Sequence, residues 1–206
     1  MRYLKLKENL KEFRIFSIND IRKIDNTFHR RRLNEWQDKG YIKKIVKGYY
    51  MFSDTTVNDD TLYYISNKIY NPSYVSLEIA LSYYNLLPET VYSVTSVSTK
   101  RTYKFSTPVG ELTYRSIKPE LFFGYKIIKA GDNISYMIAE PEKAFLDYLY
   151  FNPQYNIVKD YAELRINEDI FREDIDENKL FSYLERFGQK KLSARTTNLL
   201  RYLKND

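Results

Sequence analysis

Apolar positions recur at helical spacing in three segments of the first 40 residues. Residues 1–13 place four apolar side chains where a helix would pack them. Residues 18–24 form a second helical pattern, and the hydroxyl of Ser17 is placed to cap it. A third pattern covers about residues 27–39, and Asp25 stands between the last two patterns as a breaker and a cap. The sequence therefore predicts three short helices in succession.

An extended pattern comes after the third predicted helix. Gly40 stands where a left-handed residue commonly ends a helix. Two β-rich runs, residues 41–46 and 49–52, flank a Lys-Gly turn, which is typical of a β hairpin. Three helices followed by a hairpin predict a winged helix-turn-helix, a class of fold that binds DNA.

The third predicted helix separates into two faces. At about 100° per residue, Phe28, His29, Leu33 and Trp36 share the face that we expect to be packed. The opposite face offers guanidinium and amide groups, which suit phosphates and base edges in a major groove. Lysines of the hairpin are placed to hold the flanking backbone. The predicted DNA-binding residues are Thr27, Arg30, Arg31, Asn34, Lys43, Lys44 and Lys47.

The pattern changes after the hairpin. A polar stretch, residues 53–60, favours a boundary between a domain of residues 1–56 and one of residues 57–206. Two helices are expected next, capped by Asp60 and Ser76, and then a β-rich core that Pro141 ends as the first residue of another helix. The predicted segments are helices 61–70 and 77–84, four or five antiparallel strands within 91–137, and helices 142–151, 158–164, 177–187 and 193–203. The predicted fold class is α+β, a winged helix joined to a larger α+β domain with a C-terminal helical extension.

The distribution of charge supports a nucleic-acid partner. Residues 1–56 hold 14 basic and 7 acidic residues, a net charge of +7, whereas residues 57–206 hold 19 and 20, a net charge of −1. The formal excess of +6 therefore lies in the predicted DNA-binding segment. We expect nearly all phosphate contacts there.

Composition narrows the possible chemistry. The chain of 206 residues is 43% hydrophobic, which is enough for buried cores. It has no cysteine, so disulfides, thiolate nucleophiles and cysteine-bound zinc are excluded. Its single histidine cannot build a histidine-based metal site. With no signal peptide and no apolar stretch of membrane-spanning length, we expect a cytoplasmic protein without a membrane partner.

Three clusters of charged residues could carry a function. The first consists of Glu140, Glu142 and Lys143, which bring two acids and a lysine together, as in metal-dependent nucleases. Pro141 is expected to begin a helix there, and acidic residues are favourable at the positive N-terminal end of a helix. The favoured explanation is therefore a helix start, with Lys143 forming an ion pair with Asp147 one turn later. The acidic stretch 168–177 is interpreted as a solvated loop, with docking to a basic partner as the alternative. Three further basic residues are interpreted as a hairpin tip, with an extra nucleic-acid contact as the alternative: Lys100, Arg101 and Lys104.

Several ordered stretches resemble the AbiEi family of antitoxins. The likeness covers roughly residues 16–152, and it includes Gly40-Tyr41-Ile42 and Lys47-Gly48-Tyr49-Tyr50 of the predicted winged helix. The other stretches are 72–84 (PSYVSLEIALSYY), 86–89 (LLPE), 93–97 (SVTSV), 107–110 (TPVG) and 139–147 (AEPEKAFLD). The resemblance implies a bacterial autorepressor whose winged helix binds operator DNA. It also implies that the rest of the chain counteracts a nucleotidyltransferase-like toxin in a type IV toxin–antitoxin, abortive-infection system.

The sequence thus predicts an antitoxin and transcriptional repressor. Its partners are double-stranded operator DNA and a cognate toxin, and we expect no enzyme, no catalytic or metal-binding residue and no cofactor. One alternative is a ligand-sensing winged-helix regulator without a toxin, to which an apolar pocket with convergent polar groups would point. The other is a metal-dependent nuclease, to which acids around a divalent ion would point.

Overall fold

The computed structural model describes residues 1–88, 93–131 and 133–204. We call residues 1–52 the N-terminal unit. Its elements are α1 (Tyr3–Leu10), β1 (Phe16–Ser17), α2 (Ile18–Ile24), α3 (Arg31–Asp38), β2 (Ile42–Val46) and β3 (Tyr49–Phe52). The three helices and the hairpin predicted from the sequence are therefore present. Val91, where the predicted β-rich core begins, and Glu89 of one stretch that carries the resemblance lie outside the described residues.

Helix α2 begins and ends where the sequence predicts, because its signals are local. The Asp20 backbone N–H donates to Ser17 Oγ at 3.3 Å, and the Ser17 N–H donates to the Asp20 carboxylate at 2.8 Å. This reciprocal capping satisfies N–H groups that have no partner within the helix. The predicted cap is confirmed.

Helix α1 is shorter than predicted. Leu6 and Leu10 are buried, but Leu4 is 77% exposed and Phe13 is 42% exposed. Residues two apart on a helix point in nearly opposite directions, so Leu4 and Leu6 cannot share a face. Phe13 lies beyond Leu10, the last helical residue. The prediction that all four apolar residues of this segment pack inward was wrong for these two.

The three-stranded sheet of the N-terminal unit is shared by two cores. Its order is β1-β3-β2, and both pairings are antiparallel. One face, with Tyr50 and Phe52, joins a core made with the three helices. The other face contributes Ile45 and Met51 to the larger core of the chain, together with Ile15, which directly precedes β1. The sheet therefore joins the N-terminal unit to the larger part of the molecule.

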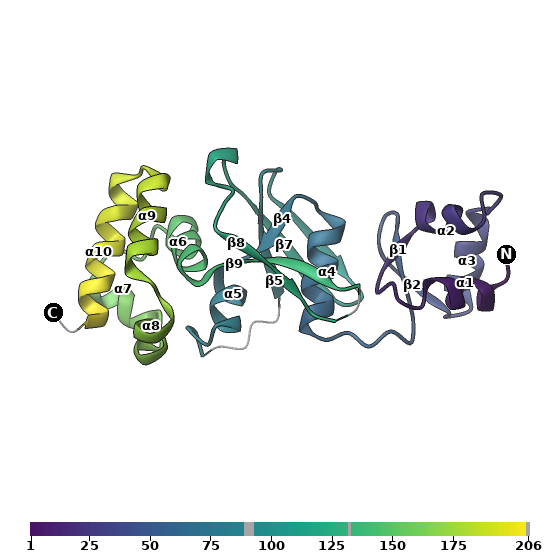
Figure 1. Ribbon diagram of the computed structural model, residues 1–206, viewed down its shortest axis with the longest axis horizontal. Coiled ribbons are helices and arrows are strands. Elements are labelled where there is room, and N and C mark those ends of the chain that lie inside the picture. Colours follow the sequence, from purple (N-terminus) through teal and green to yellow (C-terminus); the bar gives the residue numbers. More distant parts are fainter. Residues whose placement is uncertain (89–92, 132, 205–206) are drawn as a thin grey trace.

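The rest of the chain begins with a six-stranded mixed sheet and its helices. The strand order is β6-β7-β5-β4-β9-β8. The elements are α4 (Asp59–Ile69), β4 (Ser73–Val75), α5 (Leu77–Tyr83), β5 (Ser93–Ser98), β6 (Tyr103–Thr107), β7 (Gly110–Ser116), the 3-10 turn η1 (Pro119–Leu121), β8 (Tyr125–Lys129) and β9 (Ser135–Ala139). Figure 1 shows this sheet in the middle of an elongated molecule, with the N-terminal unit at one end.

Several predictions for this region need correction. Strand β4 was missed, and β4–β9 and β5–β7 are parallel, so the expected sheet of antiparallel strands was wrong in these pairs. Asn58, not Asp60, caps α4 by accepting from the Thr61 N–H at 3.0 Å. Ser76 precedes α5 as predicted, but its hydroxyl donates to the Asp147 carboxylate at 2.9 Å instead of capping the helix.

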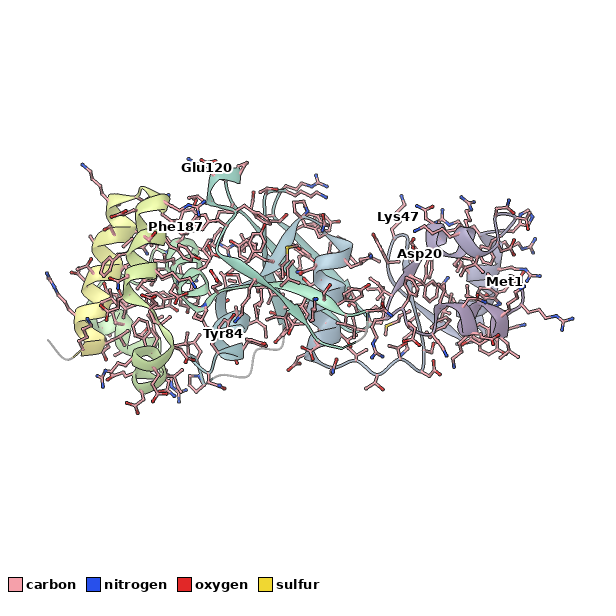
Figure 2. The ribbon with its side chains drawn as sticks, in the orientation of Figure 1. Met1, Asp20, Lys47, Tyr84, Glu120 and Phe187 are labelled. Carbon is pink, nitrogen blue, oxygen red and sulfur yellow. The ribbon has the colours of Figure 1, made fainter. Side chains whose placement is uncertain are left out.

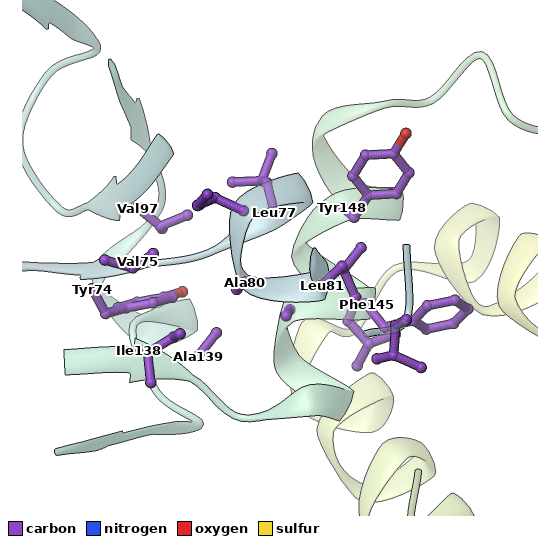
Figure 3. Close-up of a cluster of buried hydrophobic side chains, with 14 of the residues drawn as sticks. Tyr74, Val75, Leu77, Ala80, Leu81, Val97, Ile138, Ala139, Phe145 and Tyr148 are labelled. Atoms are coloured by element: carbon purple, nitrogen blue, oxygen red, sulfur yellow. The ribbon is translucent and has the colours of Figure 1, made fainter. Parts of the chain in front are cut away.

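The larger core lies where α5 fills the space between the sheet and the next helix. Figure 3 shows Leu77, Ala80 and Leu81 of α5 lying between sheet residues such as Val75 and the side chain of Phe145. All five side chains are buried. Burial of this apolar surface is the main term that stabilises the fold.

Helices cover the other end of the molecule (Figure 1). They are α6 (Pro141–Phe151), α7 (Val158–Glu163), α8 (Glu168–Asp174), α9 (Glu177–Phe187) and α10 (Lys190–Lys204). The start of α6 at Pro141 and the cap of α9 by Asp176 are confirmed. Helix α8 occupies most of the stretch interpreted as a solvated loop, so that interpretation was wrong. Asn167 caps α8, and Phe171 anchors it in the core.

Candidate nucleic-acid interface

Helix α3 exposes basic residues because its apolar residues share the opposite face. Leu33 and Trp36 are buried, and the ring of Phe28 lies 5.5 Å from that of Trp36. Arg31 and Asn34, three residues apart, are both exposed. The predicted division of this helix into a packed and a polar face is confirmed for these residues. His29 is exposed, so the expectation that it packs inward was wrong.

The helix begins four residues later than predicted, which separates Thr27 from the other polar residues. The Asp25 carboxylate accepts from the Thr27 N–H at 3.1 Å and from the Thr27 hydroxyl at 2.7 Å. Such local bonds offer the backbone an alternative to the helix. Thr27 therefore lies in the turn between α2 and α3, and Arg30 lies at the N-cap of α3 without making a side-chain cap.

The two strand lysines of the hairpin point to opposite sides of the sheet. Lys44 is paired with Tyr50, which belongs to the smaller core beside α3, whereas Lys43 is paired with Met51, which belongs to the larger core. Paired residues share a face, and neighbours on a strand alternate. Lys44 therefore lies on the α3 side, and Lys43 lies on the side of the six-stranded sheet.

The hairpin turn carries the third lysine. Lys47 precedes Gly48, whose φ of +95° is a conformation that favours glycine. Lys47 is exposed, and Figure 2 places it at the upper edge of the molecule. The register of the hairpin thus spreads its three lysines around the hairpin instead of placing them on one face.

These basic residues are available for anions. Within the part of the chain that the structure describes, no ion pair involves Arg30, Arg31, Lys43, Lys44 or Lys47. Three other basic residues of the same unit have a partner within the molecule: Lys7 with Asp54, Lys23 with Asp20, and Arg32 with the backbone oxygen of Met1. The remaining basic residues of the unit likewise have no ion pair among the described residues, so the free cations include the predicted contact residues and extend beyond them.

The acids and the lysine near Pro141 are occupied by structural contacts. The Lys143 ammonium is buried, contacts Asp147 and donates to the Tyr74 hydroxyl at 2.8 Å. Burial lowers the pKa of Lys143, and Asp147 opposes that shift. The predicted Lys143–Asp147 ion pair is confirmed, and it also fastens α6 to β4.

Glu140 and Glu142 bind the C-terminal helices. Lys179 Nζ lies 3.2 Å from a carboxylate oxygen of each. Tyr183 donates to Glu140, and the Asp176 N–H donates to Glu142 at 3.1 Å. Burial alone would raise the pKa of Glu140, but the hydrogen bonds from Tyr183 and Lys179 outweigh it and hold the pKa below its ordinary value. These contacts fit the helix-start interpretation.

One feature without any signal in the sequence is a cavity of about 260 Å³ between α4 and β9. The Asn67 side-chain oxygen accepts from the Met137 N–H at 2.6 Å, and its amide nitrogen is buried without a hydrogen-bond partner among the described residues. Tyr64 and Lys68 also line this cavity. No periodicity or motif indicates it, because Asn67 and Met137, which meet in its wall, are 70 residues apart.

Comparison with known protein families gives no matching family model, and comparison with curated proteins gives no match either. None of the helices in the described ranges is long and apolar enough to span a bilayer. Nor do the described acids and histidine gather in a group of three that could hold a metal ion.

Proposed function

We propose that the N-terminal unit is a winged helix-turn-helix that binds double-stranded DNA. The observation that carries this proposal is the free basic surface on α3 and the hairpin, held by a unit with the element order α1-β1-α2-α3-β2-β3. In such folds the second helix of the turn enters the major groove, and the hairpin contacts the flanking backbone. Here α3 supplies Arg31 and Asn34, its N-cap residue is Arg30, and the hairpin supplies Lys44 and Lys47.

The binding test uses duplex DNA from upstream of the protein's own gene. Affinity should fall steeply with salt, by about 0.9 in the log–log slope for each phosphate neutralised. Arg31→Ala should cost about 1–3 kcal/mol on the bound site and less on random DNA, whereas Lys47→Ala should weaken both alike. Lys191→Ala, an exposed change at the opposite end of the molecule, is the matched control. Affinity that does not change between low and physiological salt would rule the proposal out.

We further propose that the chain represses its own operon and counteracts a nucleotidyltransferase-like toxin, as the resemblance to AbiEi antitoxins implies. Support comes from two stretches that carry the resemblance, 72–84 and 139–147. Tyr74 and Ser76 of the first donate hydrogen bonds to Asp147 of the second, each at 2.9 Å. The two stretches thus meet in the interior of one fold.

The test of this function separates neutralisation from repression. The adjacent gene is expressed from a foreign promoter, so that binding at the native operator cannot change its level. Full-length protein should restore growth, and Arg31→Ala should restore it equally well while binding the operator more weakly. If wild-type protein fails to restore growth, the antitoxin proposal fails even where DNA binding succeeds.

A ligand-sensing regulator is the second candidate, and the Asn67 cavity is the observation that favours it. An unpaired buried amide is costly, so a bound polar molecule would stabilise the protein. Native mass spectrometry of the purified protein should then reveal a retained small molecule that Asn67→Leu loses. Protein that carries no such molecule and restores growth in the toxin assay would favour the antitoxin.

A further inference from the structure

The sequence suggested that the loop between β5 and β6 is a hairpin tip. This was wrong, because β7 lies between these two strands in the sheet. The loop is held in place at several points. The Tyr70 hydroxyl donates to the Arg101 oxygen at 2.7 Å, the Ser116 N–H donates to the Thr102 hydroxyl at 3.2 Å, and the Lys100 N–H donates to the Ser98 hydroxyl at 3.1 Å. Residues 99–102 therefore present their side chains from a fixed backbone.

Two cations project from this loop without an ion pair among the described residues, Lys100 and Arg101. The Lys100 ammonium lies 5.4 Å from the ring centre of Tyr70, and the Arg101 guanidinium lies 5.7 Å from that of Tyr103. Both side chains are exposed, so the rings orient the charges without neutralising them. Lys104 differs, because it pairs with Glu111 at 2.8 Å.

This loop lies on the side of the six-stranded sheet nearest the wing. Strand β6, which comes directly after the loop, is an edge strand, and it contacts β2, the edge strand that carries Lys43. Lys43 faces the larger core, toward β6 and away from α3.

We infer that Lys100 and Arg101, with Lys43 as the link from the wing, form a second phosphate-binding surface that holds the duplex flanking the site contacted by α3. This inference rests on the proposed DNA binding and departs from the expectation that residues 1–56 make nearly all phosphate contacts. Because the two cationic side chains are already held in place, they lose little conformational entropy when they bind a phosphate. Phosphate contacts set the position of a duplex without reading its sequence.

The test compares two lengths of the footprinted site from the protein's own upstream DNA. A duplex of about 12 base pairs covers little more than one helical turn, and one of about 30 base pairs adds flanking DNA. On the long duplex, the double variant Lys100→Ala/Arg101→Ala should lower the log–log salt slope by about 1.8, which is about 0.9 for each of two phosphates. Raising salt from about 50 to about 200 mM should then weaken the wild type about 12-fold more than the variant. On the short duplex, the two proteins should bind alike.

The matched control is Lys190→Ala/Lys191→Ala, which removes two exposed charges at the start of α10, at the other end of the molecule. It should leave the long-duplex slope unchanged, which separates local contact from loss of net charge. If the loop variant binds the long duplex like the wild type, or if it weakens both lengths equally, the second surface does not exist as inferred. If the wild type binds neither duplex, the proposed function itself has failed. Equal unfolding midpoints of the three proteins show that the loop change leaves the fold intact.

Discussion

Replacing Asp147 by Asn removes the carboxylate that the buried ammonium of Lys143 contacts. The two side chains are 0% exposed, and Asp147 also accepts from Tyr74 and Ser76. Asparagine keeps the size and one acceptor oxygen, so the change acts mainly on charge. It leaves an ammonium inside the protein with the Tyr74 hydroxyl and three aromatic rings around it.

The magnitude depends on the two states open to Lys143. A buried charge left without its partner costs about 3–5 kcal/mol. The alternative is to lose the proton, which costs about 1.36 kcal/mol for each unit between the pH and the ordinary lysine pKa of 10.5, or about 4.8 kcal/mol at pH 7. At pH 9 the same route costs only about 2 kcal/mol. The destabilisation should therefore approach about 5 kcal/mol at pH 7 and shrink to about 2 kcal/mol or less at pH 9.

The assay is urea unfolding of wild type and Asp147→Asn at pH 7 and pH 9. The sign is set by the pKa shift: folding lowers the pKa of Lys143, so the cost is present below the folded-state pKa and is relieved as the pH rises toward the unfolded value. Lys143→Met, which leaves no ammonium, should show no such relief. A loss of stability that is equal at the two pH values, or below about 1 kcal/mol at pH 7, would refute the reasoning.

Three further predictions concern local contacts. Ser17→Ala should lower the free energy of unfolding by about 1 kcal/mol in urea titrations, because α2 loses its cap, and an unchanged midpoint would contradict this. Glu140 stabilises the fold above its ordinary pKa of 4.5 and loses that contribution as the pH falls through its lowered folded-state pKa, so Glu140→Gln should flatten the acid limb of a stability profile below that ordinary value. Gly124→Ala should destabilise more than Gly40→Ala by thermal melting: both have φ near +70°, but an added Cβ at Gly124 would lie 3.0 Å from Lys143 atoms, whereas the space at Gly40 is open.

Features that depend on contacts between residues close together in the sequence could be predicted from it. Ser17 and Asp20 are three residues apart, and together they define the start of α2. Lys143 and Asp147 are four apart on one helix, so their ion pair was also visible in the sequence. The start of α3 was misjudged, because a helical pattern cannot show that Asp25 captures the turn before it.

Features made by distant segments were not predictable. Strand β4 has three residues, too few for an alternating pattern, and its partners β5 and β9 are supplied by much later parts of the chain. The exposure of the seven candidate contact residues agrees with the sequence, but the opposite orientation of Lys43 and Lys44 depends on the pairing register with β3. The loop that carries Lys100 was wrongly predicted to be a hairpin tip, because β5 and β6 are consecutive in the sequence but are not neighbours in the sheet.

The sheet shared by two cores has a consequence for how the protein is made. Residues 1–52 leave the ribosome first, and their helices can fold against one face of that sheet at once. The other face, with Ile45 and Met51, gains its covering only after β6, which contacts β2, has been synthesised, and β6 ends at Thr107. At about 5–20 residues per second, these side chains remain in contact with water for about 3–11 seconds. During synthesis, therefore, the N-terminal unit passes through a folded form with an exposed apolar face that can associate with other proteins. A truncated protein that ends near residue 56 would keep that face exposed permanently.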